Sequence, residues 1–162
     1  MNSDNVKKLN ELEAEVSTLR HIKRVNELLL FASGELQRRA VEHDRTKLED
    51  PEKSVFAEYT AKLKDCTYGS DEYKGYLEQM APALKHHYLH NRHHPEHFVR
   101  GVENMNLFDL IEMVVDWKSA SERHEDGDIY RSIAINSERF GISDQLTHII
   151  ANTVMVILAR GE

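Results

Sequence analysis

The sequence predicts an all-α protein, a single-domain bundle of about six or seven helices. Its 162 residues include only three prolines and seven glycines, so few positions interrupt a helix. Apolar residues recur at intervals of three or four, and no segment shows the strict alternation of a half-buried strand. A chain of this length buries enough surface to fold as one domain over residues 1–162 without disulfides.

A long first helix is expected over residues 4–32. Its apolar stripe suits either a dimer seam, with residues 1–18 as an extension that joins two copies, or a helix that lies on its own core. Ser33-Gly34 predicts a break, and a second helix then runs from Glu35 to about His43. The stripe consists of Leu9, Leu12, Val16 and Leu19, and continues with a slip through Ile22, Val25 and Leu29.

Two helices are expected in the middle of the chain. Asp50-Pro51 has the form of an N-cap followed by a proline at the first helical position, which starts a helix over 51–64. Ser70 or Asp71 caps the next helix, which leads toward a histidine-rich stretch and bends near Pro82.

Three further helices complete the expected bundle. Asn106 caps the most hydrophobic of them, over 107–124. A helix over 128–139 follows, and Gly141 terminates it. Ser143 caps the final helix.

Charge and composition exclude several classes of protein. The net charge of −7, with neutral histidines, argues against general nucleic-acid binding, which needs a basic surface. No segment approaches the ~20 apolar residues of a membrane span. The single cysteine, Cys66, excludes a disulfide framework and fits a reducing compartment, so we expect a cytoplasmic protein.

The stretch HHYLHNRHHPEH, residues 86–97, holds six of the ten histidines of the chain. Its internal position and mixed composition distinguish it from a purification tag. Residues three or four apart share a helix face, so the six imidazoles cannot all face the same point. We expect His87 and His94 to face a metal, and the substitutes for them are His86, His90 and His93.

Four residues outside this stretch have the side chains of a metal site. His21 lies on the first helix, His43 and Asp44 end the second, and Asp116 lies within the apolar segment VVDW. Taken alone, Asp116 is equally a helix-face carboxylate that points to water. Together, imidazoles and carboxylates suit Mn, Fe, Co, Ni or Zn, and the aspartates also tolerate Mg.

The order H…HD…D resembles the pattern of the HD-domain metal-dependent phosphohydrolase superfamily. The segment HDRTK is similar to the HD-x-x-K form of that superfamily. Four blocks, HDRTKL, HHYLHNRHHPEHF, DLIEMVVDW and INSERFGISDQL, resemble a small uncharacterised HD-like family, a domain of unknown function common in bacteriophage and bacterial genomes. This resemblance spans roughly residues 20–152 and implies a helical bundle of the HD-domain type.

The resemblance also implies roles for individual residues. His21, His43, Asp44 and Asp116 would hold one metal ion, and the histidine-rich stretch a second, so one or two ions per chain are expected. Asp44 and Lys47 would be catalytic. The residues expected by their charge to contact a substrate phosphate are Lys47, Arg45 and Arg92.

The expected function is that of a metal-dependent phosphohydrolase acting on a nucleotide or a related small phosphate ester. A nucleotide monophosphatase is the first choice, and cleavage of a cyclic or oligonucleotide signal is the alternative within this class. A protein that binds metal or nucleotide without turnover is a separate alternative. If a bacteriophage encodes the chain, its location is the cytoplasm of the host.

Overall fold

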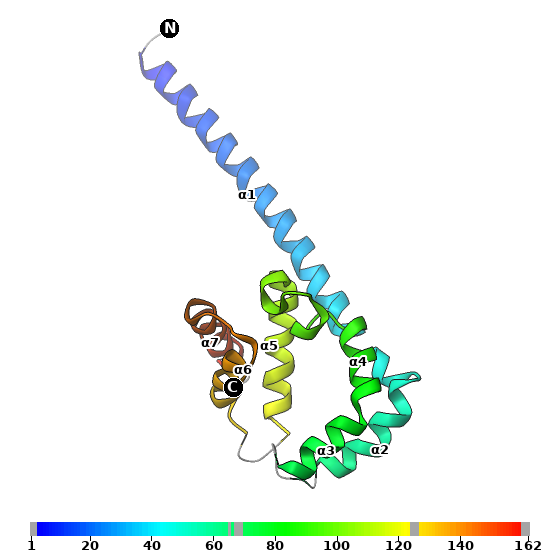
Figure 1. The fold of residues 1–162 in the computed structure, drawn as a ribbon. Coiled ribbons are helices and arrows are strands. Elements are labelled where there is room, and N and C mark those ends of the chain that lie inside the picture. Colours follow the sequence, from blue (N-terminus) through cyan, green and yellow to red (C-terminus); the bar gives the residue numbers. More distant parts are fainter. Residues whose placement is uncertain (1–2, 65, 67–69, 124–126, 160–162) are drawn as a thin grey trace. The chain divides into compact units, whose positions relative to one another are not determined.

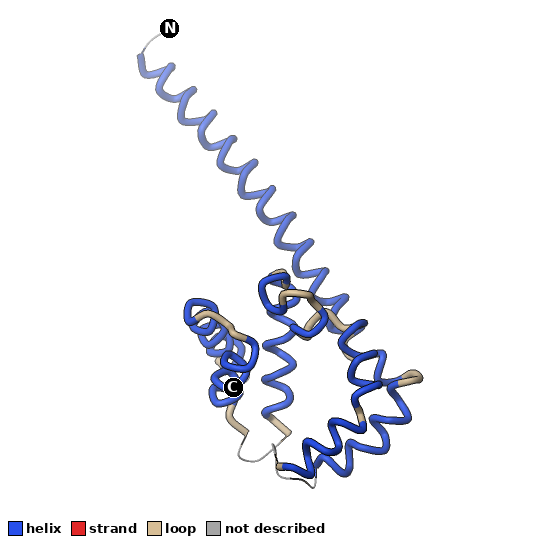
Figure 2. Tube along the Cα trace, in the orientation of Figure 1, coloured by secondary structure: helices blue, strands red, loops and turns tan. Residues whose placement is uncertain are grey.

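The computed structural model describes residues 3–64, 66, 70–123 and 127–159. Within these ranges all regular structure is helical, which confirms the all-α prediction (Figure 2). The contacts divide the chain into two units, residues 1–41 and 42–162, and each is described by itself. No helix in the described part of the chain combines the length and apolar character needed to cross a membrane.

The first unit is a single helix, α1 (Ser3–Glu42) (Figure 1). The break expected at Ser33-Gly34 is wrong, because α1 continues through both residues. A glycine inside a helix costs only about 1 kcal/mol relative to alanine, which the neighbouring turns can offset. Directly after Gly34, the Glu35 carboxylate lies 2.8 Å from both Arg38 and Arg39, and these two ion pairs favour helix in this segment.

The second unit begins with a short 3-10 helix, η1 (Arg45–Leu48), and three α-helices, α2 (Glu52–Lys64), α3 (Asp71–Gln79) and α4 (Ala81–His90). The expected N-cap Ser70 accepts a hydrogen bond from the backbone N–H of Tyr73. The expected bend near Pro82 is a full interruption, since Met80 separates α3 from α4. Proline has no backbone N–H, so it suits the first turn of a new helix. Helix α2 packs against α3, α4 and η1.

The last three helices, α5 (Leu107–Ser121), α6 (Ile129–Phe140) and α7 (Asp144–Leu158), enclose the main hydrophobic core. The expected caps at Asn106 and Ser143 and the expected stop at Gly141 are confirmed: Asn106 forms a capping box with Asp109, Gly141 ends α6 in the left-handed region, and Ser143 caps α7. Helix α5 ends at Ser121, three residues before the expected 124. The buried core residues are Met113, Val114, Ile129, Ile133, Ile142, Ile150 and Val154.

The connection from α4 to α5 carries the second half of the histidine-rich stretch and two 3-10 helices, η2 (Pro95–His97) and η3 (Gly101–Asn104). Arg92 anchors it, because the guanidinium donates two hydrogen bonds, of 3.1 and 3.0 Å, to the buried carboxylate of Asp109 at the start of α5. A bidentate pair of this kind fixes both distance and orientation. The histidines that follow Arg92, His93 and His94, are therefore held near α5.

Two glycine substitutions with opposite expected effects test this description of the helices. Gly75 lies inside α3, and a Cβ atom there meets no atom within 4 Å, so Gly75→Ala should stabilise the protein by about 0.5–1 kcal/mol. Gly141 has φ +62°, where a Cβ clashes with the backbone, so Gly141→Ala should destabilise it by about 1–2 kcal/mol. Urea unfolding of the two variants measures both changes in the free energy of unfolding. Changes of the same sign would contradict the placement of Gly75 inside a helix and of Gly141 in the left-handed region.

Candidate metal centre

Four segments of the second unit bring imidazole and carboxylate groups together. The first directly follows α1, the second is α4, the third is the loop after α4, and the fourth is α5. In this order they contribute His43 and Asp44, then His87, then His93 and His94, then Glu112 and Asp116.

Asp44 lies at the centre of this cluster. Its Oδ1 atom lies 3.3 Å from Nε2 of His87 and 3.4 Å from Nε2 of His93. Its Oδ2 atom lies 2.6 Å from Nζ of Lys47 and 3.7 Å from Nε2 of His43. Asp44 has φ 56°, the left-handed region, which aspartate adopts more readily than most residues and which is often found at functional positions. This turn directs the carboxylate toward the imidazoles.

Two buried polar atoms in the cluster have no hydrogen-bond partner: Oδ1 of Asp44 and Nε2 of His93. They are the only such side-chain atoms in the described part of the chain, and they lie 3.4 Å apart. A buried polar atom without a partner costs about 1–3 kcal/mol, so a pair of them facing each other calls for an additional group. A divalent cation bound between a carboxylate oxygen and an imidazole nitrogen would satisfy both.

Carboxylates also hold the outer nitrogens of these rings. Nδ1 of His87 lies 2.9 Å from Oε2 of Glu52, a carboxylate that is fully buried. Oε1 of Glu112 lies 3.0 Å from Nδ1 of His43 and 3.2 Å from Nδ1 of His93. A carboxylate on Nδ1 keeps the proton there and leaves Nε2 free as a ligand, the arrangement usual for histidines that bind metals. All three Nε2 atoms face Asp44.

Glu52 is itself fixed by a small polar network. Its Oε2 atom accepts a hydrogen bond of 2.9 Å from Thr46, and its Oε1 atom lies 2.7 Å from Nδ1 of His86. Thr46 in turn accepts a hydrogen bond of 2.8 Å from the side-chain amide of Asn91. The network joins η1, α2 and the end of α4, so it fixes the orientation of His87.

A second group of potential ligands shares Asp44 with the first. Nε2 of His43 lies 3.6 Å from Oδ1 of Asp116, and one ligand atom from each of His43, Asp44 and Asp116 falls within 4.8 Å of the others. Asp44 also groups with His87, His93 and His94, because one ligand atom from each of these four residues lies within 4.8 Å of the others. Because one carboxylate belongs to both groups, two ions bound here would share it.

The charges of the cluster shift several pKa values. The Asp116 and Glu112 carboxylates raise the pKa of His43 to about 10. Burial opposes ionisation of Asp44, but its contacts with His87, His93 and Lys47 outweigh burial and hold its pKa well below the usual range. Burial, together with the neighbouring His93 and His87, lowers the pKa of His94 to about 3, so this ring is neutral near pH 7. The cluster thus contains ionised carboxylates and at least one neutral imidazole.

The cluster brings together five of the six residues that the sequence favours as metal ligands, and the exception is His21. It includes His43, Asp44 and Asp116 from the H…HD…D pattern, and His87 and His94 from the histidine-rich stretch. It also includes His93, which the sequence offered only as a substitute and which is 2% exposed. The loop after α4 explains this difference, because its backbone no longer follows the helical spacing used to choose among the histidines.

Three other candidate ligands are in none of the groups found among the described residues. His21 has an exposed side chain on α1, in the unit of residues 1–41. Nδ1 of His86 contacts Glu52 on the outer side of the network. His90 is exposed, and its Nδ1 atom lies 2.8 Å from the backbone carbonyl oxygen of His86.

The three cations expected to contact a phosphate differ in their surroundings. Lys47 lies beside the cluster, with its ammonium 2.6 Å from Asp44 and 5.1 Å from the centre of the Phe56 ring. Arg45 is exposed. Arg92 is paired with Asp109, which gives it the structural role described above. Of the three, Lys47 is placed best to act in the cluster.

Sequence analysis missed the two carboxylates that hold the rings, Glu52 and Glu112. Glu112 lies four residues before Asp116 within the segment LIEMVVDW, whose other residues are apolar, so both side chains share a face of α5, and this spacing was a usable signal. Glu52 has no comparable signal, because its contacts with His86 and His87 join residues 34 and 35 positions apart.

Comparison with known proteins gives a family and no function. No curated protein and no solved structure matches the chain. The model of a family of unknown function (DUF5662) matches residues 10–156, which confirms the expected resemblance to an uncharacterised domain. The relation to the HD superfamily stays a prediction. Since the match covers most of the sequence, the chain belongs to this family of unknown function, DUF5662.

Proposed function

We propose that the protein is a metal-dependent phosphohydrolase whose centre is the cluster around Asp44. The observation that supports it most is the facing pair of buried atoms without partners, Oδ1 of Asp44 and Nε2 of His93. The donor set of imidazole nitrogens and carboxylate oxygens fits Mn, Fe, Co, Ni or Zn, with Mg as a weaker candidate. His87, His93, His94 and Asp44 would hold one ion, and His43, Asp44 and Asp116 a second.

The residues of the chain have separate roles in this proposal. A bound divalent ion would supply positive charge for a phosphate oxygen and lower the pKa of a water molecule. Asp44 stays ionised and can orient the attacking water as a hydrogen-bond acceptor. Lys47, at the edge of the cluster, supplies a charge that attracts an anionic substrate. Glu52 and Glu112 keep the imidazoles in the orientation that directs Nε2 inward.

The substrate that we propose is a nucleotide or a related small phosphate ester, with a nucleoside monophosphate first. The support is the sequence resemblance to HD-type enzymes together with a cation next to the cluster. Cyclic or oligonucleotide signals are the alternative in the same class. The proposed location is the cytoplasm, and the host cytoplasm if a bacteriophage encodes the chain.

A protein that binds metal or nucleotide without turnover is the second candidate function. The same cluster supports it, because a buried and well-ordered set of ligands is equally suited to storage or sensing. Titration calorimetry detects whether a nucleotide binds. Recovery of the bound nucleotide intact would favour binding without turnover over hydrolysis.

Metal content is the first test of the proposal. Untagged protein should contain one or two equivalents of a transition metal per chain by elemental mass spectrometry. His93→Ala removes a ligand in the cluster and should lower the content by at least one equivalent. His90→Ala is the matched control, since this histidine is exposed and in none of the groups. No metal after reconstitution with Mn, Fe, Co, Ni or Zn, or equal loss in both variants, would reject the centre.

Hydrolysis is tested on a panel of nucleoside monophosphates, triphosphates and cyclic nucleotides by the release of phosphate or of the opened product. Asp44→Asn keeps the size of the side chain but removes its charge, and should lower turnover by at least about a hundredfold. Asp71→Asn, on the exposed start of α3, should leave it unchanged. Turnover retained in the folded Asp44→Asn protein would contradict the mechanism.

Proton release on metal binding gives a test of the charge distribution. With a pKa of about 10, His43 is protonated near neutral pH in the absence of metal, and a metal must displace that proton. Metal affinity should therefore rise about tenfold per pH unit between about pH 6 and 9. Titration calorimetry in two buffers of different ionisation enthalpy counts the proton. His43→Gln should release one proton fewer, and an equal count in both proteins would contradict the assignment.

A further inference from the structure

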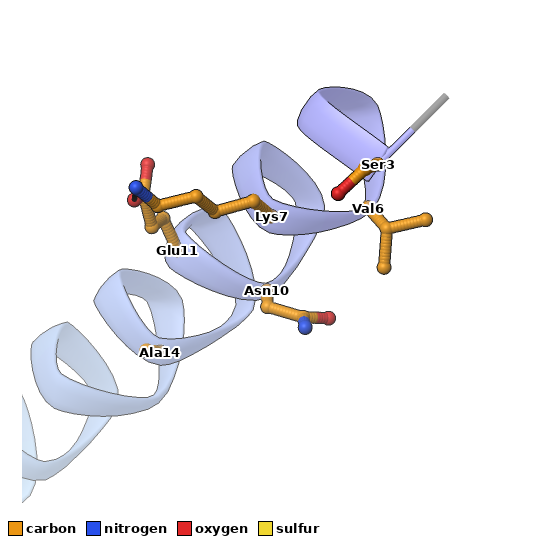
Figure 3. A pocket seen from close by; sticks show the side chains of 6 residues that line it. All are labelled: Ser3, Val6, Lys7, Asn10, Glu11 and Ala14. Carbon is orange, nitrogen blue, oxygen red and sulfur yellow. Dashed lines mark ion pairs between the residues drawn. The ribbon is translucent and has the colours of Figure 1, made fainter. Parts of the chain in front are cut away.

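Every group of potential metal ligands found among the described residues contains His43 or Asp44. The concave surface at the start of α1 brings no such donors together. Figure 3 shows that its side chains project from a single helix, and its two charged members, Lys7 and Glu11, pair with each other at 4.0 Å. The cluster around Asp44 is therefore the place where donors converge, and its two groups differ in ways that favour different ions.

The first group, the inner position, consists of Asp44, His87, His93 and His94 and has the spacing of a four-coordinate ion. Nε2 of His87 lies 2.9 Å from Nε2 of His94 and 3.3 Å from Oδ1 of Asp44. Nε2 of His93 lies 3.4 Å from the same oxygen. Bonds of about 2.0–2.1 Å to a tetrahedral ion place its ligand atoms about 3.3–3.4 Å apart. Three imidazoles and one carboxylate therefore suit Zn, Co or Fe better than Mg or Mn.

The second group, the outer position, consists of His43, Asp44 and Asp116 and is both wider and richer in carboxylate. Nε2 of His43 lies 3.7 Å from Oδ2 of Asp44 and 3.6 Å from Oδ1 of Asp116. One imidazole and two carboxylates form a harder set of donors, which suits Mn or Mg. These ions prefer octahedral coordination and keep water ligands, so three protein ligands leave room for a substrate oxygen.

Burial separates the two positions as well. In the inner position, His87 and His93 are 1% and 2% exposed. In the outer position, the side chains of His43 and Asp116 are 29% and 22% exposed. The two buried atoms without partners, Oδ1 of Asp44 and Nε2 of His93, both belong to the inner position. An ion there is enclosed by the protein, whereas solvent and substrate reach an ion at the outer position.

We propose that the two positions take different ions: the inner position keeps a tightly bound Zn, Co or Fe ion, and the outer position takes an exchangeable Mn or Mg ion that binds the substrate phosphate. This inference rests on the proposed function and assigns the substrate to one of the two positions. Asp44 joins them, because its Oδ1 atom faces the inner imidazoles and its Oδ2 atom faces His43. Lys47 lies 2.6 Å from the same Oδ2 atom, so its charge also favours a phosphate at the outer position.

A pair of variants tests this assignment without any substrate. Metal-free protein receives one equivalent of Zn and is then titrated with Mn, which electron paramagnetic resonance counts. His94→Ala removes an inner ligand and should weaken Zn binding at least about a hundredfold, since loss of a residue that only orients a ligand already costs roughly 10–100-fold. Asp116→Ala is the matched variant of the outer position, and should retain Zn but lose the bound Mn. Equal weakening of Zn binding in both variants, or Mn binding that survives in Asp116→Ala, would overturn the proposal.

Cobalt and inorganic phosphate probe the two positions separately. One equivalent of Co should give the strong visible absorption of a four-coordinate ion in the original protein and in Asp116→Ala, but not in His94→Ala. Inorganic phosphate should change the resonance spectrum of Mn in the Zn-loaded protein, and an unchanged spectrum would overturn the placement of the substrate. Circular dichroism verifies that the variants are folded, and His94→Gln, which keeps more of the side-chain volume, replaces His94→Ala if the latter unfolds.

These measurements distinguish failure of the inference from failure of the proposed function, because none of them requires turnover. Two unequal positions in a protein that hydrolyses no nucleotide would reject the proposed function alone. Two equivalent positions in an active enzyme would reject the inference alone. A protein that binds no metal would reject both.

Discussion

The half-buried carboxylate of Asp44 is the constraint on which the candidate centre depends. It belongs to both groups of potential ligands, and imidazole nitrogens face both of its oxygens. An ionised carboxylate in such a position is stable only if positive charge or hydrogen-bond donors compensate its burial. Lys47 supplies one such charge on Oδ2, whereas Oδ1 lacks a hydrogen bond. This imbalance is the clearest physical reason to place a cation in the cluster.

The surrounding structure serves to hold that arrangement in place. Glu52 and Glu112 fix the outer nitrogens of the rings, and the Arg92–Asp109 pair holds the loop that carries His93 and His94 against α5. Helix α5 is in turn fixed by the apolar core that it shares with α6 and α7. The Arg92–Asp109 pair therefore determines the distance between the ligands on α5 and those in the loop. Such preorganisation is what a metal site requires, because ligands must hold their geometry before the ion binds.

Local chemistry allowed the sequence alone to predict most of the secondary structure and part of the centre. Caps at Ser70, Asn106 and Ser143 are visible because a side chain bonds a backbone N–H two or three residues away. The break predicted at Gly34 is wrong because a glycine inside a helix costs little free energy, and ion pairs further along the helix offset that cost.

His43, Asp44 and Asp116 could be named from their order, since the pattern itself carries the resemblance. Tertiary structure alone decided that His93 turns inward, that His86 and His90 do not join the groups, and that Glu52 and Glu112 hold the rings. Those outcomes depend on contacts between residues as many as 69 positions apart, such as His43 and Glu112. Local spacing cannot encode them, because the packing of whole helices determines which distant side chains meet.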